Sequence, residues 1–305
     1  SAGFDLFTST SESNSNRAYG VDSYGGTIRF GIPITEKLSS RVFYTYSNQE
    51  LSVASRKLEP DPTIDADTIQ GNTPGELSAA LARNLSWSKS GFGYSLTYND
   101  LDNIRTPRSG TYLSISQTFY GAGADASYAS TEATAVRYAI LSEDADIAAM
   151  LRARGGANFT YGNANGYRPQ DNFCQGSRDI RGFESYGFGP RDLITGDALG
   201  GMYYWNATAE VTFPLPYLPD SLGIRGAVFA DAGQLWGIDS ASRNAIIAAG
   251  GTTGQLDDNT LRASIGASII WASPFGPLRF DYAVPVSQAP WDRTREFSFG
   301  VSTSF

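Results

Sequence analysis

Apolar and polar residues alternate along most of this chain, so that every second side chain shares a face. The last eleven residues, REFSFGVSTSF, carry mostly phenylalanine and valine on one face and serine, glycine and glutamate on the other. Upstream, LRFDYAVPV and LRASIGASIIW alternate in the same way. A period of two is typical of β-strands with one apolar and one polar face, rather than of helices, whose period is about 3.6.

The alternation predicts about twelve strands. Most of them are longer than the ~5–6 residues of a typical globular strand. They match the ~9–11 residues that a tilted strand needs to cross a bilayer. The expected strands lie near residues 1–9, 23–33, 38–52, 84–99, 110–120, 126–141, 147–162, 200–213, 223–236, 260–272, 278–286 and 295–305.

Two kinds of connection alternate between these strands. Short ones fall near 34–37, 100–109, 142–146, 214–222 and 273–277, and mostly longer ones near 10–22, 53–83, 121–125, 163–199, 237–259 and 287–294. Short turns on one side and long loops on the other are the layout of an outer-membrane barrel, whose turns face the periplasm. No run approaches 18 apolar residues, which excludes a transmembrane helix. The prediction is an all-β, antiparallel transmembrane β-barrel with both termini in the periplasm.

A soluble β-sandwich or a large soluble barrel also has one apolar face per strand, so alternation alone leaves these folds open. The number and length of the strands favour the membrane barrel, as do aromatic residues near strand ends, where such barrels carry interfacial girdles. The residues expected in these girdles are Trp87, Tyr203, Trp205, Trp236, Trp271 and Phe305. A membrane barrel has to close, because lipid offers no hydrogen-bond partner to the backbone of an open edge.

Composition narrows the function. The formal net charge is −8, whereas nucleic-acid binding requires a clustered basic face, so no nucleic-acid partner is expected. The chain has no histidine, which excludes a serine–histidine catalytic pair, and its single cysteine, Cys174, cannot form an internal disulfide. We therefore expect no catalytic, cofactor or metal site, and no enzyme.

The parity of two strands places acidic side chains in the barrel interior. In GMYYWNATAEVTFP the aromatic and alanine positions form the lipid face, so Glu210 points inward. In GIRGAVFADAG, Asp231 points inward together with Phe229. The loop 163–199 carries the sequence IRGFE. If this loop folds back into the lumen, Arg181 meets both carboxylates, and its planar guanidinium suits bidentate contacts with them.

Gly182 and Phe183 fit this hypothesis, because glycine permits a close approach or a positive φ and phenylalanine can anchor the tip of the loop. The alternative is a solvated Arg181, with the two carboxylates paired instead with inward-facing arginines. These arginines are Arg152, Arg154 and Arg225. Spacing alone leaves both arrangements open.

Several segments resemble the BamA family of outer-membrane protein assembly factors. DIRGFESYGFGPRD is similar to the arginine–glycine–phenylalanine signature of the family's sixth extracellular loop. VFADAGQLWG is similar to its phenylalanine-x-aspartate-x-glycine motif, through Phe229, Asp231 and Gly233. DALGGMYYWNATAEVTFPLP resembles the strand after that loop, with Glu210 at the acidic position. LTYNDLDNIRTPRSGTYL resembles a periplasmic turn of the family. WASPFGPLRFDYAVPV resembles its penultimate hairpin, and REFSFGVSTSF its terminal strand.

The resemblance spans nearly the whole chain and implies a fold. Family members carry periplasmic POTRA repeats and a barrel of about sixteen strands, whereas SAGFDLF at the start of this chain resembles the fifth strand. Residues 1–305 are then the C-terminal part of the barrel domain, with loop 163–199 folded inward and the POTRA repeats absent. In the family, the loop's arginine bonds to acidic residues on the following strands, which here implies Arg181 with Glu210 and Asp231.

The resemblance also implies a function, the folding and insertion of β-barrel proteins into the bacterial outer membrane, without a cofactor. The implied partners are outer-membrane lipids, nascent β-barrel client proteins and, through regions absent here, accessory assembly lipoproteins. The terminal strand is the expected weak seam, through Phe297, Phe299, Gly300, Val301 and Phe305. The alternative is a related barrel of the same superfamily that translocates polypeptides or assembles autotransporters. A passive porin is disfavoured, because a pinned loop would obstruct its channel.

Overall fold

The computed structural model describes most of the chain. The described residues are 1–12, 16, 19–53, 86–104, 106–162, 166–191, 198–216, 218–219, 222–240, 243, 259–273 and 276–301. Phe305, expected at the end of the terminal strand and in an aromatic girdle, lies outside the described residues.

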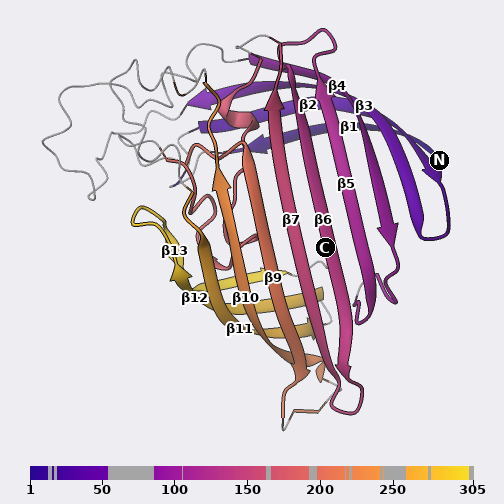
Figure 1. Ribbon diagram of the computed structural model, residues 1–305, viewed down its shortest axis with the longest axis vertical. Helices are drawn as coiled ribbons and strands as arrows, with labels where there is room; N and C mark the ends of the chain where they lie inside the picture. The colour runs from indigo at the N-terminus through magenta and orange to yellow at the C-terminus, as the bar shows by residue number, and fades with distance from the viewer. Residues whose placement is uncertain are drawn as a thin grey trace, which may run out of the picture.

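Within the described residues, twelve antiparallel strands form one sheet in the order of the sequence, which confirms the predicted all-β fold. In Figure 1, β5, β6 and β7 run side by side in front, while β11 and β12 pass behind them, so the sheet curves around an interior. The strands of this sheet are β1 (Ala2–Ser11), β2 (Tyr19–Pro33), β3 (Leu38–Val53), β4 (Ser86–Asn99), β5 (Gly110–Tyr120), β6 (Tyr128–Ser142), β7 (Ile147–Thr160), β9 (Tyr203–Pro214), β10 (Ile224–Trp236), β11 (Arg262–Ser273), β12 (Gly276–Ser287) and β14 (Phe297–Val301). A separate pair joins β8 (Gly182–Phe183) to β13 (Thr294–Arg295), and a short 3-10 helix spans Pro169–Asp171.

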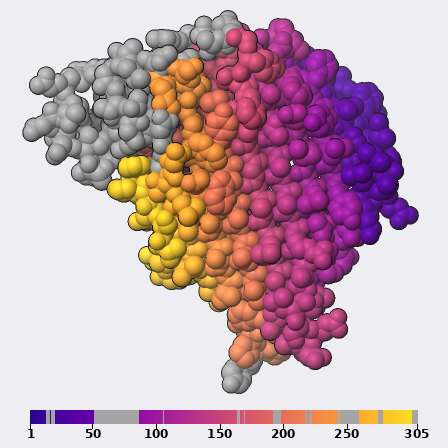
Figure 2. Space-filling model, viewed as in Figure 1, coloured from indigo at the N-terminus to yellow at the C-terminus, as the bar shows by residue number. Residues whose placement is uncertain are grey.

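The two faces of the sheet have opposite character, as the alternation predicts. Outward apolar side chains such as Phe92 and Val228 are 61% and 48% exposed, whereas inward Glu210 and Asp231 are 6% and 3% exposed. An exposed apolar wall around a polar interior is the reverse of a soluble protein and matches a lipid-facing barrel. Figure 2 shows this wall as closely packed side chains over β4–β10. Within the described residues, no helix is long and apolar enough to cross a membrane.

The loop between β7 and β9 fills part of the interior with apolar side chains. One buried cluster contains Trp87, Ala126, Tyr128, Tyr167 and Met202. A second contains Ile180, Phe183, Phe188, Tyr204 and Leu235. The expectation that Trp87 belongs to an outer aromatic girdle is wrong, because this side chain is 2% exposed and its Nε1 donates to Asp171 of the loop at 2.9 Å.

The terminal strand begins two residues later than the expected range of 295–305, and the structure describes it as far as Val301. The segment Thr294–Arg295 does not join the large sheet, because its backbone pairs with Gly182–Phe183 of the loop instead. The strand of the large sheet begins at Phe297 and pairs with β12 over residues 278–282. Competition from the loop for backbone hydrogen bonds therefore sets where this strand begins.

The sheet has two edges, β1 and β14, and within the described residues neither edge pairs with a further strand. The described strands therefore form an open curved sheet. In particular, residues 1–9 do not pair with the described residues of the terminal strand.

Two neighbouring residues of β2 test which face meets lipid. Ile28 faces outward and is 46% exposed, whereas Thr27 faces inward, with its Oγ1 at 3.0 Å from Thr45 Oγ1. We expect Ile28→Arg to lower the free energy of unfolding by about 2–4 kcal/mol, because a charged side chain near the bilayer midplane loses its hydration. Thr27→Arg should cost clearly less. Urea titration in lipid vesicles measures both, and equal losses would contradict the assigned faces.

Candidate functional site

The loop between β7 and β9 turns back into the interior and brings Arg181 to the inner wall. Its tip forms β8, which pairs with β13 and thereby holds the loop beside the end of the sheet. Gly182 has a φ of +92°, a conformation that residues with a Cβ rarely adopt. Phe183 follows with no exposed surface and packs edge-on against Phe188, at 5.1 Å between ring centroids.

Arg181 binds Asp231 of β10 bidentately, through the Nε–Nη2 edge of its guanidinium. Nε donates to Oδ2 at 2.7 Å and Nη2 donates to Oδ1 at 2.8 Å. The backbone amide of Arg181 donates to Oδ2 as well, at 3.1 Å. The Asp231 side chain is 1% exposed, so this carboxylate exchanges water for the loop arginine.

Glu210 of β9 binds the remaining prong of the same arginine. Nη1 of Arg181 donates to Glu210 Oε2 at 2.7 Å, and the Glu210 side chain is 6% exposed. The structure thus brings together the three residues that parity and the loop sequence singled out. The arginines of the alternative arrangement bind elsewhere: Arg152 donates to Thr208, Arg154 pairs with Asp179 and Arg225 pairs with Asp146.

The Phe229 ring packs against the flat face of the Arg181 guanidinium. The Arg181 guanidinium carbon lies 3.3 Å from the centroid of the Phe229 ring, a cation–π contact. Gly266 of β11 makes room for that ring, because a Cβ there would lie 2.5 Å from Phe229 Cζ. Gly233 is further along β10, where a Cβ would lie 2.5 Å from Trp205 O of β9. The close approach of neighbouring strands therefore requires glycine at both positions.

The sequence did not single out two further members of the network, Arg279 and Asp281 of β12. Arg279 donates to Glu210 through Nη1 at 3.0 Å and Nη2 at 2.6 Å, and its Nε donates to Asp281 Oδ1 at 2.7 Å. Asp281 also lies 3.8 Å from Arg181. Both residues occupy the polar face of an alternating strand, which was the available signal. We call the six residues Arg181, Glu210, Phe229, Asp231, Arg279 and Asp281 the loop lock.

The loop has a second attachment on the opposite part of the sheet. Asp171 accepts from Lys89 Nζ at 2.8 Å and from Trp87 Nε1 at 2.9 Å, both on β4. The Asp171 side chain has no exposed surface. Arg168 lies over the Trp87 ring at 4.7 Å from its centroid. The loop therefore spans the interior from β4 to β9, β10 and β12, and its sequence carried no recognisable sign of this second contact.

The expected seam residues lie on β14, next to the lock. Phe297 and Phe299 face outward and are each 58% exposed. Gly300 and Ser298 pair with Arg279 and Asp281 of β12, so the edge strand lies directly beside two members of the lock. Gly300 is not required by space, since a Cβ there would meet no atom within 4 Å. The backbone of Val301 pairs with Leu278, and its side chain is outside the described part, as is Phe305.

The lock holds a charged arginine rather than a reacting group. Burial lowers the pKa of the Arg181 guanidinium, but Asp231 and Glu210 outweigh this effect and raise it above its ordinary value. Within the described ranges, no three histidine, cysteine, aspartate or glutamate side chains are placed to hold a metal ion. The arrangement can fix a loop in position, and each buried charge in it is paired.

Comparison with known proteins places this arrangement in a family. The model of the Omp85 superfamily domain matches residues 1–305. The outer membrane protein assembly factor BamA of Neorickettsia risticii is 28% identical over 304 residues, which cover 100% of this chain and 37% of that protein. BamA of Neisseria meningitidis serogroup B is 28% identical over 323 residues, covering 100% and 39% respectively. This chain thus spans about two fifths of the length of these curated relatives.

Solved structures show the same fold. The crystal structure of BamA from Haemophilus ducreyi lacking POTRA domains 1–3 matches with a TM-score of 0.77 at 21% identity, covering 98% of this chain and 57% of that one. CdiB from Acinetobacter baumannii matches with a TM-score of 0.52 at 13% identity, covering 92% and 41%.

Removing the central arginine tests the lock. We expect Arg181→Ala to lower the free energy of unfolding by roughly 3–5 kcal/mol, because it leaves Asp231 and Glu210 buried without their partner. Arg29→Ala is the control, since the Arg29–Asp5 pair is about 40% exposed on both sides and should contribute under ~1 kcal/mol. Urea unfolding of the purified protein measures both. Equal stability of Arg181→Ala and wild type would contradict the lock, as would failure of Arg181→Glu with Asp231→Arg to recover part of either single loss.

The second attachment can be tested with the chain's own cysteine, Cys174, which is half-buried between Asp171 and Arg181. We expect Asp171→Asn to raise the rate of maleimide labelling at Cys174 several-fold, because the ion pair to Lys89 is lost. Combining it with Arg181→Ala should raise the rate further. Asp100→Asn is the matched control, since Asp100 forms the same kind of ion pair with Lys37, in the turns at the other end of β4. Labelling that is unchanged by Asp171→Asn would exclude a second attachment.

Proposed function

This chain belongs to the Omp85 superfamily and lies in the bacterial outer membrane, and we propose that it folds and inserts β-barrel proteins there. The names of its BamA relatives, outer membrane protein assembly factors, support this proposal. We further propose that residues 1–305 are the C-terminal part of a barrel of about sixteen strands, with the loop 163–199 folded into its interior.

The observation that carries the proposal is the short edge strand. The described part of β14, Phe297–Val301, has 5 residues, whereas its only described partner, β12, has 12. Upstream of Phe297, the chain leaves the large sheet to pair with the loop at Gly182–Phe183. Within the described residues, no strand pairs with the outer side of β14, so its backbone donors and acceptors are available there.

An edge of this kind can act as a template. Unpaired backbone groups in lipid are costly, so an incoming strand that pairs with them is favoured. Addition of a strand to an exposed edge is a common mode of peptide recognition. The free energy for assembly then comes from the client, which pairs its backbone and buries the apolar faces of its own strands in lipid. Such a process changes the fold of a client without any bond chemistry, so we propose no enzymatic activity and no cofactor.

The loop lock gives this edge a fixed support. Arg279 and Asp281 lie directly opposite Gly300 and Ser298 of β14. The loop that binds Arg279 through Glu210 also pairs with the segment leading into β14. We propose that the lock sets the position of the edge strand, while the strand itself stays available for pairing. Clients, outer-membrane lipids and, through regions outside this chain, accessory assembly lipoproteins are the proposed partners.

A related barrel that translocates polypeptides or assembles autotransporters is the second candidate. The likeness to CdiB, at a TM-score of 0.52, concerns the fold alone and is weaker than the likeness to BamA, at 0.77. The two candidates differ in what meets the edge, a β-barrel precursor or an extended passenger.

Photo-crosslinking at the edge tests the function. We replace Phe299 with p-benzoylphenylalanine and irradiate cells that produce the protein. The matched control is the same replacement at Phe92, which is 61% exposed on the same wall but lies on β4, an interior strand of the sheet. We expect crosslinks to newly made outer-membrane barrel proteins from position 299, identified by mass spectrometry, and few from position 92.

Three other results would count against the proposal. Equal crosslinking from both positions would mean that the edge is not special. Crosslinks from position 299 to extended passenger polypeptides would favour the translocation barrel. An absence of protein crosslinks at 299 would remove the support for strand templating.

A further inference from the structure

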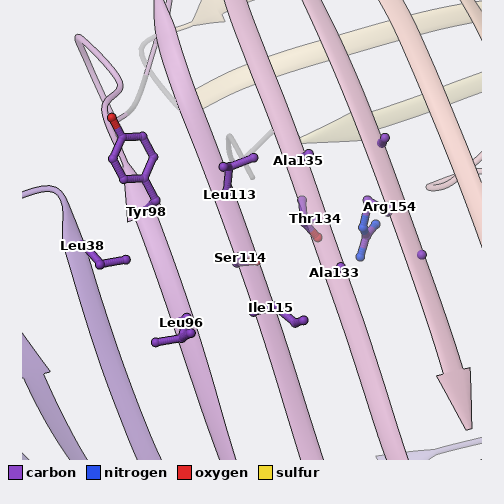
Figure 3. Close-up of a pocket in the computed structure, with 12 residues that line it drawn as sticks. Leu38, Leu96, Tyr98, Leu113, Ser114, Ile115, Ala133, Thr134, Ala135 and Arg154 are labelled. Atoms are coloured by element: carbon purple, nitrogen blue, oxygen red, sulfur yellow. The ribbon is translucent and has the colours of Figure 1, made fainter. Parts of the chain in front are cut away.

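The outer wall has an apolar hollow of about 500 Å³ over β3–β7. Figure 3 shows Leu38, Leu96 and Tyr98 on one side of it, Leu113 and Ile115 on β5, and the small residues of β6 opposite. Three alanines, Ala133, Ala135 and Ala153, line its floor, and the rest of the lining on β5–β7 is Ser114, Thr134, Arg154 and Gly155. Large side chains on one side and alanines on the other leave a groove, with a volume in the ~300–1,000 Å³ range of small-molecule sites.

A cation stands at the periplasmic end of this groove. Arg137 follows Ala133 and Ala135 on the outward face of β6 and is exposed. It lies two residues beyond Ala135, or ~7 Å along the strand. Within the described chain, the structure gives Arg137 one hydrogen bond, from Nη1 to Thr111 Oγ1 at 2.6 Å. A guanidinium has five N–H donors, so most of its donors face outward without a protein acceptor.

The same end carries a second cation and a phenol. Lys37, in the turn before β3, pairs with Asp100 at 2.6 Å. Tyr98 points its hydroxyl toward Asp100, at 3.5 Å. Hydrogen bonding from Lys37 lowers the pKa of Asp100, burial raises it, and the charges of Lys37 and Arg137 lower it further. The two cations and one carboxylate leave this corner with a net charge of one positive unit.

We propose that this groove binds one anionic glycerophospholipid of the periplasmic leaflet, with the headgroup phosphate at Arg137 and an acyl chain over the alanine floor. A guanidinium fork matches the geometry of a phosphate. Tyrosine is favoured at the depth where headgroup and hydrocarbon meet. The apolar groove continues from this level toward the middle of the membrane, which is the direction an acyl chain takes below its headgroup. Charge and shape therefore favour the same ligand.

A general annular layer of lipid would make different demands. Any smooth apolar wall satisfies annular lipid, and an arginine can reach the interface alone by extending its side chain. Here the hollow and the arginine lie on the same face of one strand, β6, and Thr111 orients the guanidinium. A specific site requires both features together, so each can be removed separately.

The experiment is native mass spectrometry of the purified protein in detergent. The probes are dioleoylphosphatidylglycerol, dioleoylphosphatidylcholine and inorganic phosphate. Ala135→Leu fills the groove, and Ala209→Leu is its control, an outward alanine on β9 that does not line the groove. Arg137→Gln removes the cation. All variants are first checked for the heat-modifiable mobility of a folded barrel, which outward substitutions of this size should preserve.

We expect a one-to-one adduct of wild type with phosphatidylglycerol and none with inorganic phosphate. Arg137→Gln should weaken the phosphatidylglycerol adduct about fivefold, since a basic residue at the membrane surface contributes ~1 kcal/mol. Ala135→Leu should weaken binding of both lipids, and Ala209→Leu neither. The proposal is overturned if Ala135→Leu and Ala209→Leu bind alike, if Arg137→Gln retains the wild-type preference, or if phosphate binds without a lipid chain.

Discussion

The paired contact of Arg181 with Asp231 and Glu210 is the constraint on which the interior depends. Both carboxylates sit on neighbouring strands of the inner wall with almost no exposed surface, and a buried carboxylate needs a partner of opposite charge. The wall itself supplies Arg279, which binds Glu210, but the two prongs on Asp231 come from the loop. Asp231 of the inner wall therefore has its bidentate arginine partner only when the loop is docked. The same ion pairs therefore fix the position of the loop and stabilise the inner wall.

A loop fixed across the interior is unlike the open interior expected of a passive pore. A diffusion channel needs an interior that is open from end to end. Here the loop crosses the interior and is attached at both sides: its Asp171 binds β4, and its Arg181 binds β9 and β10. Between the attachments, Phe183 and Phe188 pack against Tyr204 and Leu235. Ion pairs at both ends and apolar packing between them make the loop a structural part of the interior.

The sequence predicted the sheet well because its signal is local. A strand with lipid on one side and water on the other repeats every two residues, so the inward positions of Glu210 and Asp231 followed from parity alone. Contacts between distant segments have no such local signal. Arg279 and Asp281 stood on the polar face of their strand, but nothing in their spacing indicated which neighbours they bind. Trp87 was misplaced because an aromatic residue near a strand end fits either a girdle or a packed interior, and only Asp171, distant in sequence, decides between them.

Two parts of β12 have different partners at the end of the sheet. Residues 278–282 of this strand pair with β14, whereas the next stretch carries the contact from Ala283 N to Glu296 O at 2.8 Å, where the chain turns toward the loop. Pairing with β12 that continued past Phe297 toward the preceding residues would compete with β8 for residues 294–295. The docked loop therefore keeps residues 294–295 out of the large sheet, and β14 begins only at Phe297. The segment 293–296 therefore connects the docked loop, with which it pairs, to the position at which β14 begins.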